Sequence, residues 1–364
     1  MPIPIDLLSS YSLNQIRNYV SPVPMFFRDR YFQTGPKDIF TTDYVLLERK
    51  QDSRRMADFV AKRVGDIPID RDGYEIFSYR PPKVAPSRLI TADMLEERSF
   101  GEALYGNLTP EQRAVRLLAD DEQELERVVA FREEWMAVQM MLGNGFSGTE
   151  MIDDVTPGES FDLKYYDGLT SPHVYTPGAG TKWGASSTFA GVSAQITAMC
   201  NTLLKRGCRA SDLILGSEAA EVFCGLTGLM DRIDKNSGYI TGELREQITA
   251  YQGVRLLGAL NFGGHILTIF VPETTYTAKN GTETLFFPAK GIMVTAPKVA
   301  RMMYAAVTQI DRGGENFSTH AATRVYKTIV DEKNDERKLR VTARPLPVPD
   351  ADAPYMVCDN ILAE

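Results

Sequence analysis

The feature that most constrains this chain is a helical pattern from Thr109 to Leu142, with no glycine and no proline after its first turn. Thr109 can cap the amino end, Pro110 suits the first helical position, and Gln112 stands where a capping box needs its return partner. The next two residues, glycine and asparagine, form a stop signal. At ~1.5 Å per residue the helix would be a rod of roughly 50 Å, close to the width of a small domain.

The apolar positions of this helix form a broken stripe. They are Leu118, Leu125, Val128, Val129, Trp135, Met136 and Leu142. Arg132 and Gln139 interrupt a clean heptad, which disfavours a free-standing coiled coil. We expect a structural helix with sheets packed against it. Two shorter helices with a kink near Asp120 and Asp121 are the open alternative.

The composition is that of a folded protein with an acidic surface. The chain has 364 residues, enough for two or three domains, and 43% of them are hydrophobic. The net charge of −8 disfavours a dedicated nucleic-acid-binding protein, although a protein of this charge can face DNA without adhering to it. The amino-terminal residues lack the pattern of a signal peptide, and no apolar stretch is long enough to span a bilayer.

The sequence carries no readable catalytic or ligand motif. Four cysteines without CxxC spacing stand at Cys200, Cys208, Cys224 and Cys358, and the three histidines are scattered. These are interpreted as core or reduced surface thiols, which suits a reducing cytosol. There is no P-loop, HExxH, GxSxG or EF-hand loop, and Asp70–Gly73 is interpreted as a turn. We therefore predict no catalytic residue, no cofactor-binding residue and no metal ligand.

Residues 44–98 have the pattern of a long extended segment that contains β-strands. Tyr44–Glu48 and Tyr74–Tyr79 have strand character, and Phe59–Val60 is a further strand candidate. Between Arg49 and Arg63 six basic residues stand against two acidic ones: Arg49, Lys50, Arg54, Arg55, Lys62 and Arg63 against Asp52 and Asp58. A two-stranded ribbon is marginal in water unless it lies on something. The segment therefore either folds back on its own domain or reaches a partner subunit.

The long helix has the opposite charge balance. Eight acidic residues, Glu111, Asp120, Asp121, Glu122, Glu124, Glu126, Glu133 and Glu134, stand against four arginines. One interpretation is a solvated face with pairs at i, i+4. The other is that the basic ribbon of one subunit lies near the acidic helix of the next.

After the helix, Gly143–Gly148 matches GxGxxG, but a dinucleotide fingerprint needs a strand before it and a helix after it. Here a helix precedes it and Met151–Val155 has strand character, so we interpret the glycines as a helix stop and flexible turn. Residues 156–188 are predicted to be a strand followed by a loop. In that loop Trp183 is expected to pack and His173 to be structural.

From Phe189 to about Ala300 the pattern is α/β. A helical stripe ends at Gly207, and a short strand over Asp212–Gly216 precedes a helix that Ser217 can cap. Asn280-Gly281 is a hairpin signal. Strands are expected over 254–257, 265–271, 291–296, 302–310, 323–330 and 338–343. The proline-rich residues 345–354 predict an extended tail, and 355–362 could add an edge strand.

This order of elements resembles a known family. A basic ribbon ending in two prolines precedes a long acidic helix, an α/β segment and a return to strands. The stretches that carry the likeness are Tyr79–Val84, Leu89–Leu95, Phe100–Glu102, Arg132–Ala137, Phe287–Gly291 and Arg301–Tyr304. Together they resemble the lambda-like major capsid proteins of tailed phages, the major capsid protein E family.

The resemblance implies an α+β chain with the Hong Kong 97-type capsid fold. It implies an N-terminal arm over 1–43, an extended loop over 44–98, a peripheral domain over 99–188 and 301–344 with a spine helix at 109–142, an axial domain over 189–300, and a C-terminal arm over 345–364. Many copies would form the pentamers and hexamers of an icosahedral shell that encloses double-stranded DNA.

The resemblance also implies partners and a location. We expect a separate scaffold protein, because the arm over 1–43 is short, together with a portal and the packaged DNA. A decoration protein is a further partner known in the family. The expected location is the virion capsid, with assembly in the bacterial host cytoplasm. Some relatives of the fold cross-link a loop lysine to a neighbour's asparagine; Lys50 and Lys62 stand in the right segment, but no specific partner is evident.

The leading hypothesis is therefore a shell-forming structural protein. The ribbon residues expected to contact the neighbouring subunit are Arg54, Arg55, Lys62 and Arg63. Two alternatives stay open at this point. One is a cargo-enclosing compartment shell of the same fold, and the other is a soluble α/β enzyme built on residues 189–300.

Overall fold

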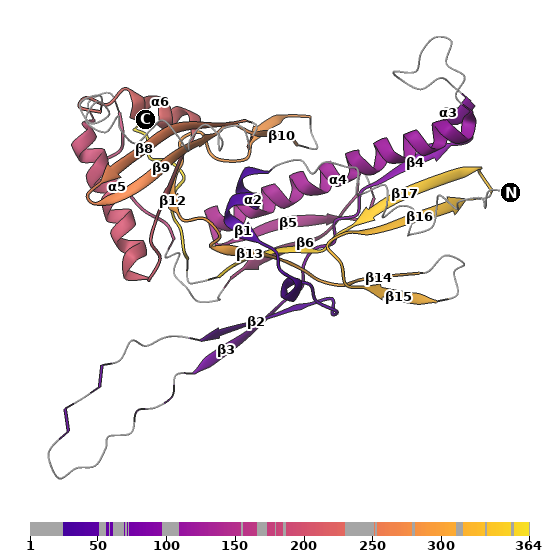
Figure 1. Cartoon of the computed structure of the whole chain (residues 1–364), viewed down its shortest axis with the longest axis horizontal. Helices are drawn as coiled ribbons and strands as arrows, with labels where there is room; N and C mark the ends of the chain where they lie inside the picture. Colours follow the sequence, from indigo (N-terminus) through magenta and orange to yellow (C-terminus); the bar gives the residue numbers. More distant parts are fainter. Residues whose placement is uncertain are drawn as a thin grey trace.

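The computed structural model describes residues 25–50, 56–57, 59–60, 69, 71, 73–96, 109–153, 156–165, 173–178, 180–184, 187–229, 251, 253–278, 281–310, 316–331, 333–350 and 353–363. Figure 1 shows a long helix, a sheet with helices at one end of it, and a two-stranded ribbon that leaves the body. Among the described helices, none is long and apolar enough to cross a membrane.

The long helix, α4 (Pro110–Gly143), is continuous over 34 residues, so the alternative with two shorter helices is wrong. The predicted capping box is confirmed. The Gln112 backbone N–H donates to the Thr109 hydroxyl at 3.3 Å, and the Thr109 N–H donates to the Gln112 side-chain oxygen at 3.1 Å. Asn144 ends the helix in the left-handed region with φ 51°. Asparagine tolerates this conformation better than most residues, which explains the stop.

The amino-terminal half of α4 packs on a three-stranded antiparallel sheet. Its strand order is β16 (Val325–Asp331), β17 (Glu336–Thr342), β4 (Ser87–Thr91). Leu118, Leu125 and Val129 of the helix are buried against Leu339 and Val341 of β17. Val128, which the sequence placed in the apolar stripe, is 45% exposed instead. The short helix α3 (Ala92–Glu96) follows β4 at the end of this layer, as Figure 1 shows.

A five-stranded sheet forms the other part of the body. Its order is β19 (Met356–Cys358), β12 (Ile292–Thr295), β7 (Asp212–Leu215), β9 (His265–Pro272), β8 (Val254–Phe262), with only β7 and β9 parallel. Helix α5 (Phe189–Lys205) buries the predicted stripe of Val192, Ile196, Met199 and Leu203. Helix α6 (Ser217–Cys224) begins after Gly216, so Ser217 is the first helical residue and not the cap.

The alternation of side chains along β7 divides the core in two. Leu213 and Leu215 pack with α5 and α6, whereas Ile214 between them packs with the carboxyl half of α4. Val357 of β19, which joins the core with α4, is likewise flanked by residues that face α5 and α6. Successive side chains of a strand point to opposite faces, so this single sheet ties the two cores together.

The glycines after α4 are part of a strand and not of a flexible turn. Strand β5 (Gly145–Met151) pairs with β6 (Pro157–Lys164), so the predicted strand over Met151–Val155 is wrong: Ile152 and Asp153 lie in the turn, and residues 154–155 lie outside the described set. A Cβ on Gly145 would lie 2.1 Å from the Leu163 carbonyl oxygen, and one on Gly148 would lie 2.8 Å from the Phe161 ring. Both glycines permit a close approach of the two strands.

The predicted strand over 302–310 divides into two. Strand β13 (Ala300–Tyr304) lies between β1 (Phe32–Gln33) and the proline-rich β18 (Pro345–Pro349). Strand β14 (Val307–Ile310) instead forms a hairpin with β15 (Phe317–His320). Proline cannot donate a ladder hydrogen bond, which suits β18 to the edge of its sheet. The predicted edge strand within 355–362 is confirmed as β19.

Four smaller elements lie elsewhere in the body. Helix α2 (Phe26–Tyr31) is buried beside α4, and the 3-10 turn η1 (Pro36–Asp38) follows β1. Strand β10 (Thr275–Thr277) pairs with β11 (Glu283–Leu285), which confirms the predicted hairpin around Gly281.

Candidate functional site

The two-stranded ribbon is the most prominent projection of the molecule. Strand β2 (Val45–Lys50) pairs only with β3 (Tyr74–Tyr79) among the described strands, and Figure 1 shows both leading away from the body. Phe59 and Val60 form no strand, which corrects the prediction; the Phe59 side chain is fully exposed. A ribbon with two free edges is marginal alone and offers unpaired backbone groups to another chain.

One face of the ribbon anchors its root to the body. Val45 and Tyr79 stand opposite each other, and Leu47 faces Phe77. Val45, Leu47 and Tyr79 are at least 92% buried, and Phe77 is partly buried. The Tyr79 ring lies 5.2 Å from the ring of Tyr165, which follows β6. This inner face therefore fixes the direction in which the ribbon leaves the core.

The other face of the ribbon is exposed, and its three large apolar or aromatic side chains alternate with the polar Glu48 and Ser78. Leu46 is 51% exposed, Ile76 56% and Tyr74 69%. Alternation along β2 and β3 places these side chains on the face opposite Val45 and Tyr79. Exposed apolar surface of this kind marks a contact site for another molecule.

The body contains two buried carboxylates on α4, side by side in the sequence. The Glu134 carboxylate accepts hydrogen bonds from the backbone N–H groups of Phe27 and Arg28, both at 2.8 Å, and so caps the start of α2. Burial raises the pKa of Glu134 to about 7, and the two N–H donors act in the opposite direction. A carboxylate from one helix thus holds the first turn of another.

Glu133 is fully buried and is the centre of an ionic network. Arg324, before β16, donates to both of its oxygens at 2.6 and 2.7 Å, and the Arg28 guanidinium lies at 3.2 Å. The Tyr304 hydroxyl of β13 donates a further hydrogen bond at 3.0 Å. Burial alone would lower the pKa of Arg324, but the Glu133 carboxylate holds it above its usual value. Four segments distant in sequence therefore meet at one side chain.

These carboxylates correct the interpretation of the acidic helix. Four of its eight acidic residues are buried: Asp121, Glu122, Glu133 and Glu134. Asp121 pairs with Arg88 of β4 at 3.0 Å, within the same chain. A wholly solvated acidic face is therefore wrong, and the helix offers much less free negative charge to a neighbour's ribbon than its composition indicated.

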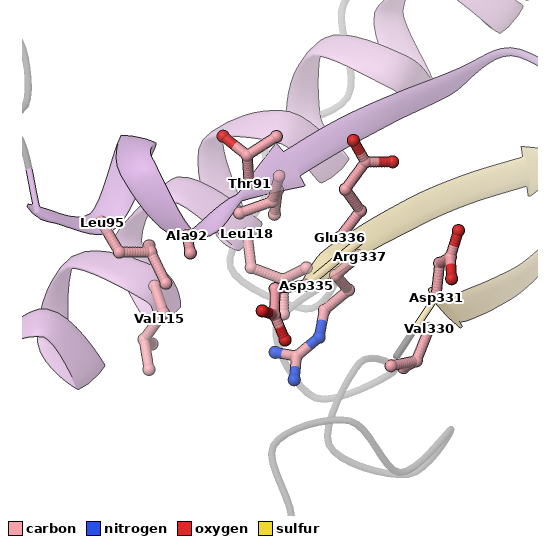
Figure 2. A pocket seen from close by; sticks show the side chains of 12 residues that line it. Thr91, Ala92, Leu95, Val115, Leu118, Val330, Asp331, Asp335, Glu336 and Arg337 are labelled. Carbon is pink, nitrogen blue, oxygen red and sulfur yellow. The ribbon is translucent and has the colours of Figure 1, made fainter. Parts of the chain in front are cut away.

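A shallow groove lies at the far end of the molecule from the five-stranded sheet. It has a volume of about 330 Å³ and lies between α3, the start of α4 and the turn that joins β16 to β17. Figure 2 shows Leu95 of α3, Val115 and Leu118 of α4 on one side, and Asp335 and Arg337 on the other. The groove is apolar at its floor and charged at one rim, and it holds no catalytic arrangement.

The comparisons with known proteins decide the identity. The family model described as phage major capsid protein E matches residues 9–354, nearly the whole chain. The chain belongs to this family. The capsid protein is thus a structural component of a phage particle, located in the virion capsid. No protein with a curated description matches it in sequence.

Solved structures support the fold of the capsid protein. A protein assigned as the capsid protein of an Escherichia coli CFT073 prophage superposes with a TM-score of 0.64 at 16% identity, covering 96% of this chain and 97% of the other. A phage-related protein from Bordetella bronchiseptica RB50 has a TM-score of 0.49 at 11% identity, over 96% and 97%. An encapsulin from Synechococcus elongatus PCC 7942 has 0.44 at 9%, over 94% and 88%. We base the Hong Kong 97-type α+β fold on the first of these.

The site residues predicted from the sequence lie outside the described part of the capsid protein. They are Arg54, Arg55, Lys62 and Arg63. Their role stays a prediction. The lysine cross-link, which the sequence did not favour, is also untested, because Lys62 lies outside the described residues. The described residues next to them, Met56 and Phe59, are fully or almost fully exposed. The sequence analysis missed the exposure of Leu46 and Ile76 on the outer face of the ribbon root.

The remaining sequence candidates of the capsid protein are structural. Trp183 is 1% exposed and donates from its indole N–H to Gln195 at 2.8 Å, and His173 is 3% exposed. Cys200 is buried, and burial raises the pKa of its thiol to about 11, which leaves it unreactive at neutral pH. Within the described residues, no group of three or more potential ligands could hold a metal ion.

Proposed function

We propose that the capsid protein assembles into pentamers and hexamers that close an icosahedral shell around double-stranded DNA. The observation that carries the proposal is the ribbon, whose inner face anchors it to the body while its outer face exposes Leu46, Tyr74 and Ile76. Exposed apolar side chains on a projecting ribbon favour burial against a neighbour. A closed shell supplies a neighbour to every copy, since repeated head-to-tail contacts form rings.

Within the shell we assign the segments as the family pattern suggests. Residues 1–43 are an N-terminal arm, 44–98 the extended loop, and 109–142 the spine helix. The peripheral domain is 99–188 with 301–344, the axial domain is 189–300, and 345–364 is a C-terminal arm. The separate core of α5, α6 and the five-stranded sheet supports a distinct axial domain. Strand β19 of the C-terminal arm extends that sheet.

The partners follow from the same proposal. The capsid protein assembles in the bacterial host cytoplasm on a separate scaffold protein and around a portal, and a decoration protein can be added to the outer surface. It has no enzymatic activity of its own. The packaged DNA is enclosed without sequence-specific contacts. The net charge of −8 supports this last point, because an acidic lining lets DNA enter and leave without adhering.

The test is assembly of the full-length chain, co-expressed with the scaffold gene of the same phage. Light scattering and negative-stain microscopy should show closed shells. Leu46→Asp combined with Ile76→Asp should abolish them, because a charged outer face resists burial against a neighbour. Leu46→Met with Ile76→Val is the matched control that keeps the face apolar and should assemble normally.

Three results would contradict the proposal. Wild-type chain that stays a small oligomer in the presence of scaffold would mean that the ribbon does not serve shell assembly. Closed shells from the double-aspartate variant, with an unchanged circular dichroism spectrum, would show that the outer face is not an interface. Purified native shells that hold a protein cargo in place of DNA would replace the proposal with a compartment shell.

A further inference from the structure

A basic pocket lies at the root of the ribbon. Its volume is about 360 Å³. Arg80 and Lys83, in the segment after β3, and Arg344, between β17 and β18, line it. Thr308 and Thr319 of the hairpin β14–β15 complete the wall, with their hydroxyls 3.0 Å apart. Guanidinium, ammonium and hydroxyl donors thus converge on one space.

The cations of this pocket have more donors than the chain satisfies. Arg80 pairs with Asp43 at 3.2 Å, and Asp43 precedes β2, the first strand of the ribbon. Arg344 donates from Nη1 to the Ala306 carbonyl at 3.3 Å, but its Nε atom is buried and has no hydrogen-bond partner among the described residues. Lys83 has no ion pair within that same part of the chain. A buried donor left without an acceptor is costly, so the pocket favours an incoming acceptor.

The electrostatic field of the neighbouring charges also favours an anion in the pocket. Burial, Arg340 and Arg344 together lower the pKa of Lys83. Burial also lowers the pKa of Arg344; Asp43 and Glu150 act against that effect, and Arg80 adds to it. Four cationic groups therefore influence one another here against two carboxylates, and the excess is positive. An anion that entered would relieve this repulsion.

We propose that this pocket binds a carboxylate side chain of a neighbouring copy of the chain, held by Lys83 and Arg344. The inference rests on the proposed shell assembly, because it needs a neighbour. It gives the root of the ribbon a defined electrostatic contact, in addition to the apolar contact of its outer face.

A carboxylate suits the pocket better than a phosphate. Charge alone does not decide between them, because the net positive lining attracts either anion; the composition of the chain and the position of the pocket do. The chain itself is rich in candidate partners, with 48 acidic residues against 40 basic ones. The pocket also lies beside the segment that projects toward a neighbour, since Asp43 precedes β2 and Arg80 follows β3.

Carbodiimide coupling tests the proposal directly, because it joins an amine to a carboxylate in contact with it. Shells are assembled from an equal mixture of chains with light and heavy nitrogen, treated, digested and analysed by mass spectrometry. We expect Lys83 cross-linked to an aspartate or glutamate, with mixed isotopes in the linked peptides. Acetylation of Lys83 should be at least about tenfold slower in shells than in free subunits, which corresponds to about 1.4 kcal/mol of pairing. The other exposed lysines provide the internal reference.

The same experiment separates the alternatives. Shells that form while Lys83 stays as reactive as in free subunits would overturn this inference and leave the proposed function standing. Links only between peptides of one isotope would overturn it too, and protection of Lys83 in DNA-filled but not in empty shells would identify the anion as phosphate. If no shells form, the proposed function fails and this contact fails with it.

Variants provide a second readout. Lys83→Glu should lose closed shells, whereas Lys83→Arg, which keeps the charge, should retain them. Lys182→Glu is the matched control, since Lys182 is an exposed lysine on the loop before α5. Normal assembly of Lys83→Glu with an unchanged circular dichroism spectrum would contradict the proposed contact.

Discussion

Replacing Glu133 by glutamine should destabilise the capsid protein far more than any exposed substitution on the same helix. Glutamine keeps the volume but leaves Arg324 without its counter-charge in a site where that side chain is only 9% exposed. Arginine does not lose its proton, so the charge stays buried. Breaking a buried ion pair from one side costs about 3–5 kcal/mol. Tyr304 and Arg28 also lose part of their acceptor, which places the expected cost in the upper part of that range.

The measurement is urea unfolding of unassembled subunits, followed by far-ultraviolet circular dichroism. Low protein concentration is needed because assembly would stabilise the folded state by mass action. Asp120→Asn is the control: this exposed acidic residue lies on the same helix, and its replacement should change the free energy of unfolding by less than about 0.5 kcal/mol.

A double-mutant cycle tests the reasoning itself. Glu133→Gln combined with Arg324→Met removes both charges, and such replacements are often neutral or better than the broken pair. The double variant should therefore be more stable than Glu133→Gln alone. If Glu133→Gln unfolds like the Asp120→Asn control, or if the two single costs simply add in the double variant, the network does not have the role that its geometry indicates.

Three further predictions follow from the same contacts. Burial raises the pKa of Glu134 to about 7 from 4.5, so its protonation contributes about 3 kcal/mol to folding stability below pH 4.5, and this contribution is lost as the pH rises to 7. Glu134→Gln should flatten this part of the stability–pH profile, measured by urea unfolding. An unchanged slope would refute the assignment. Gly148→Val should cost about 1–3 kcal/mol in the same assay, because its Cβ would collide with the Phe161 ring, whereas adding Phe161→Ala should recover part of the loss. The last prediction concerns four basic ribbon residues, Arg54, Arg55, Lys62 and Arg63. Reversing their charges should reduce the yield of closed shells, most clearly at low salt, and an unchanged yield by microscopy would exclude them as contacts.

Much of the secondary structure could be predicted from local signals. The capping box at Thr109, the asparagine stop after α4, the apolar stripe of α5 and the hairpin around Gly281 all depend on residues a few positions apart. Such neighbours set the local backbone geometry, so the sequence predicts these elements correctly. The order of the elements was also sufficient to indicate the family, which the match over residues 9–354 confirms.

The errors came from features that neighbours in sequence cannot reveal. In the sequence Gly145 and Gly148 look like a turn signal. In the structure these positions have no room for a Cβ, because Leu163 and Phe161 of the paired strand approach them closely. Acidic residues on α4 resemble a solvated face, but Glu133 is buried because Arg324 reaches it from 191 positions away. The short-range pattern of charges is the same whether or not a distant partner arrives.

For this protein, the sequence alone determined most of the helices and strands, where the long helix starts and stops, and that β2 and β3 make a ribbon. Only the tertiary structure decided which charges are buried, which face of the ribbon is anchored, and that β7 sends Leu213 and Ile214 into different cores. The physical reason is that caps and periodicity act within one segment, whereas burial and ion pairing depend on segments that meet only after folding.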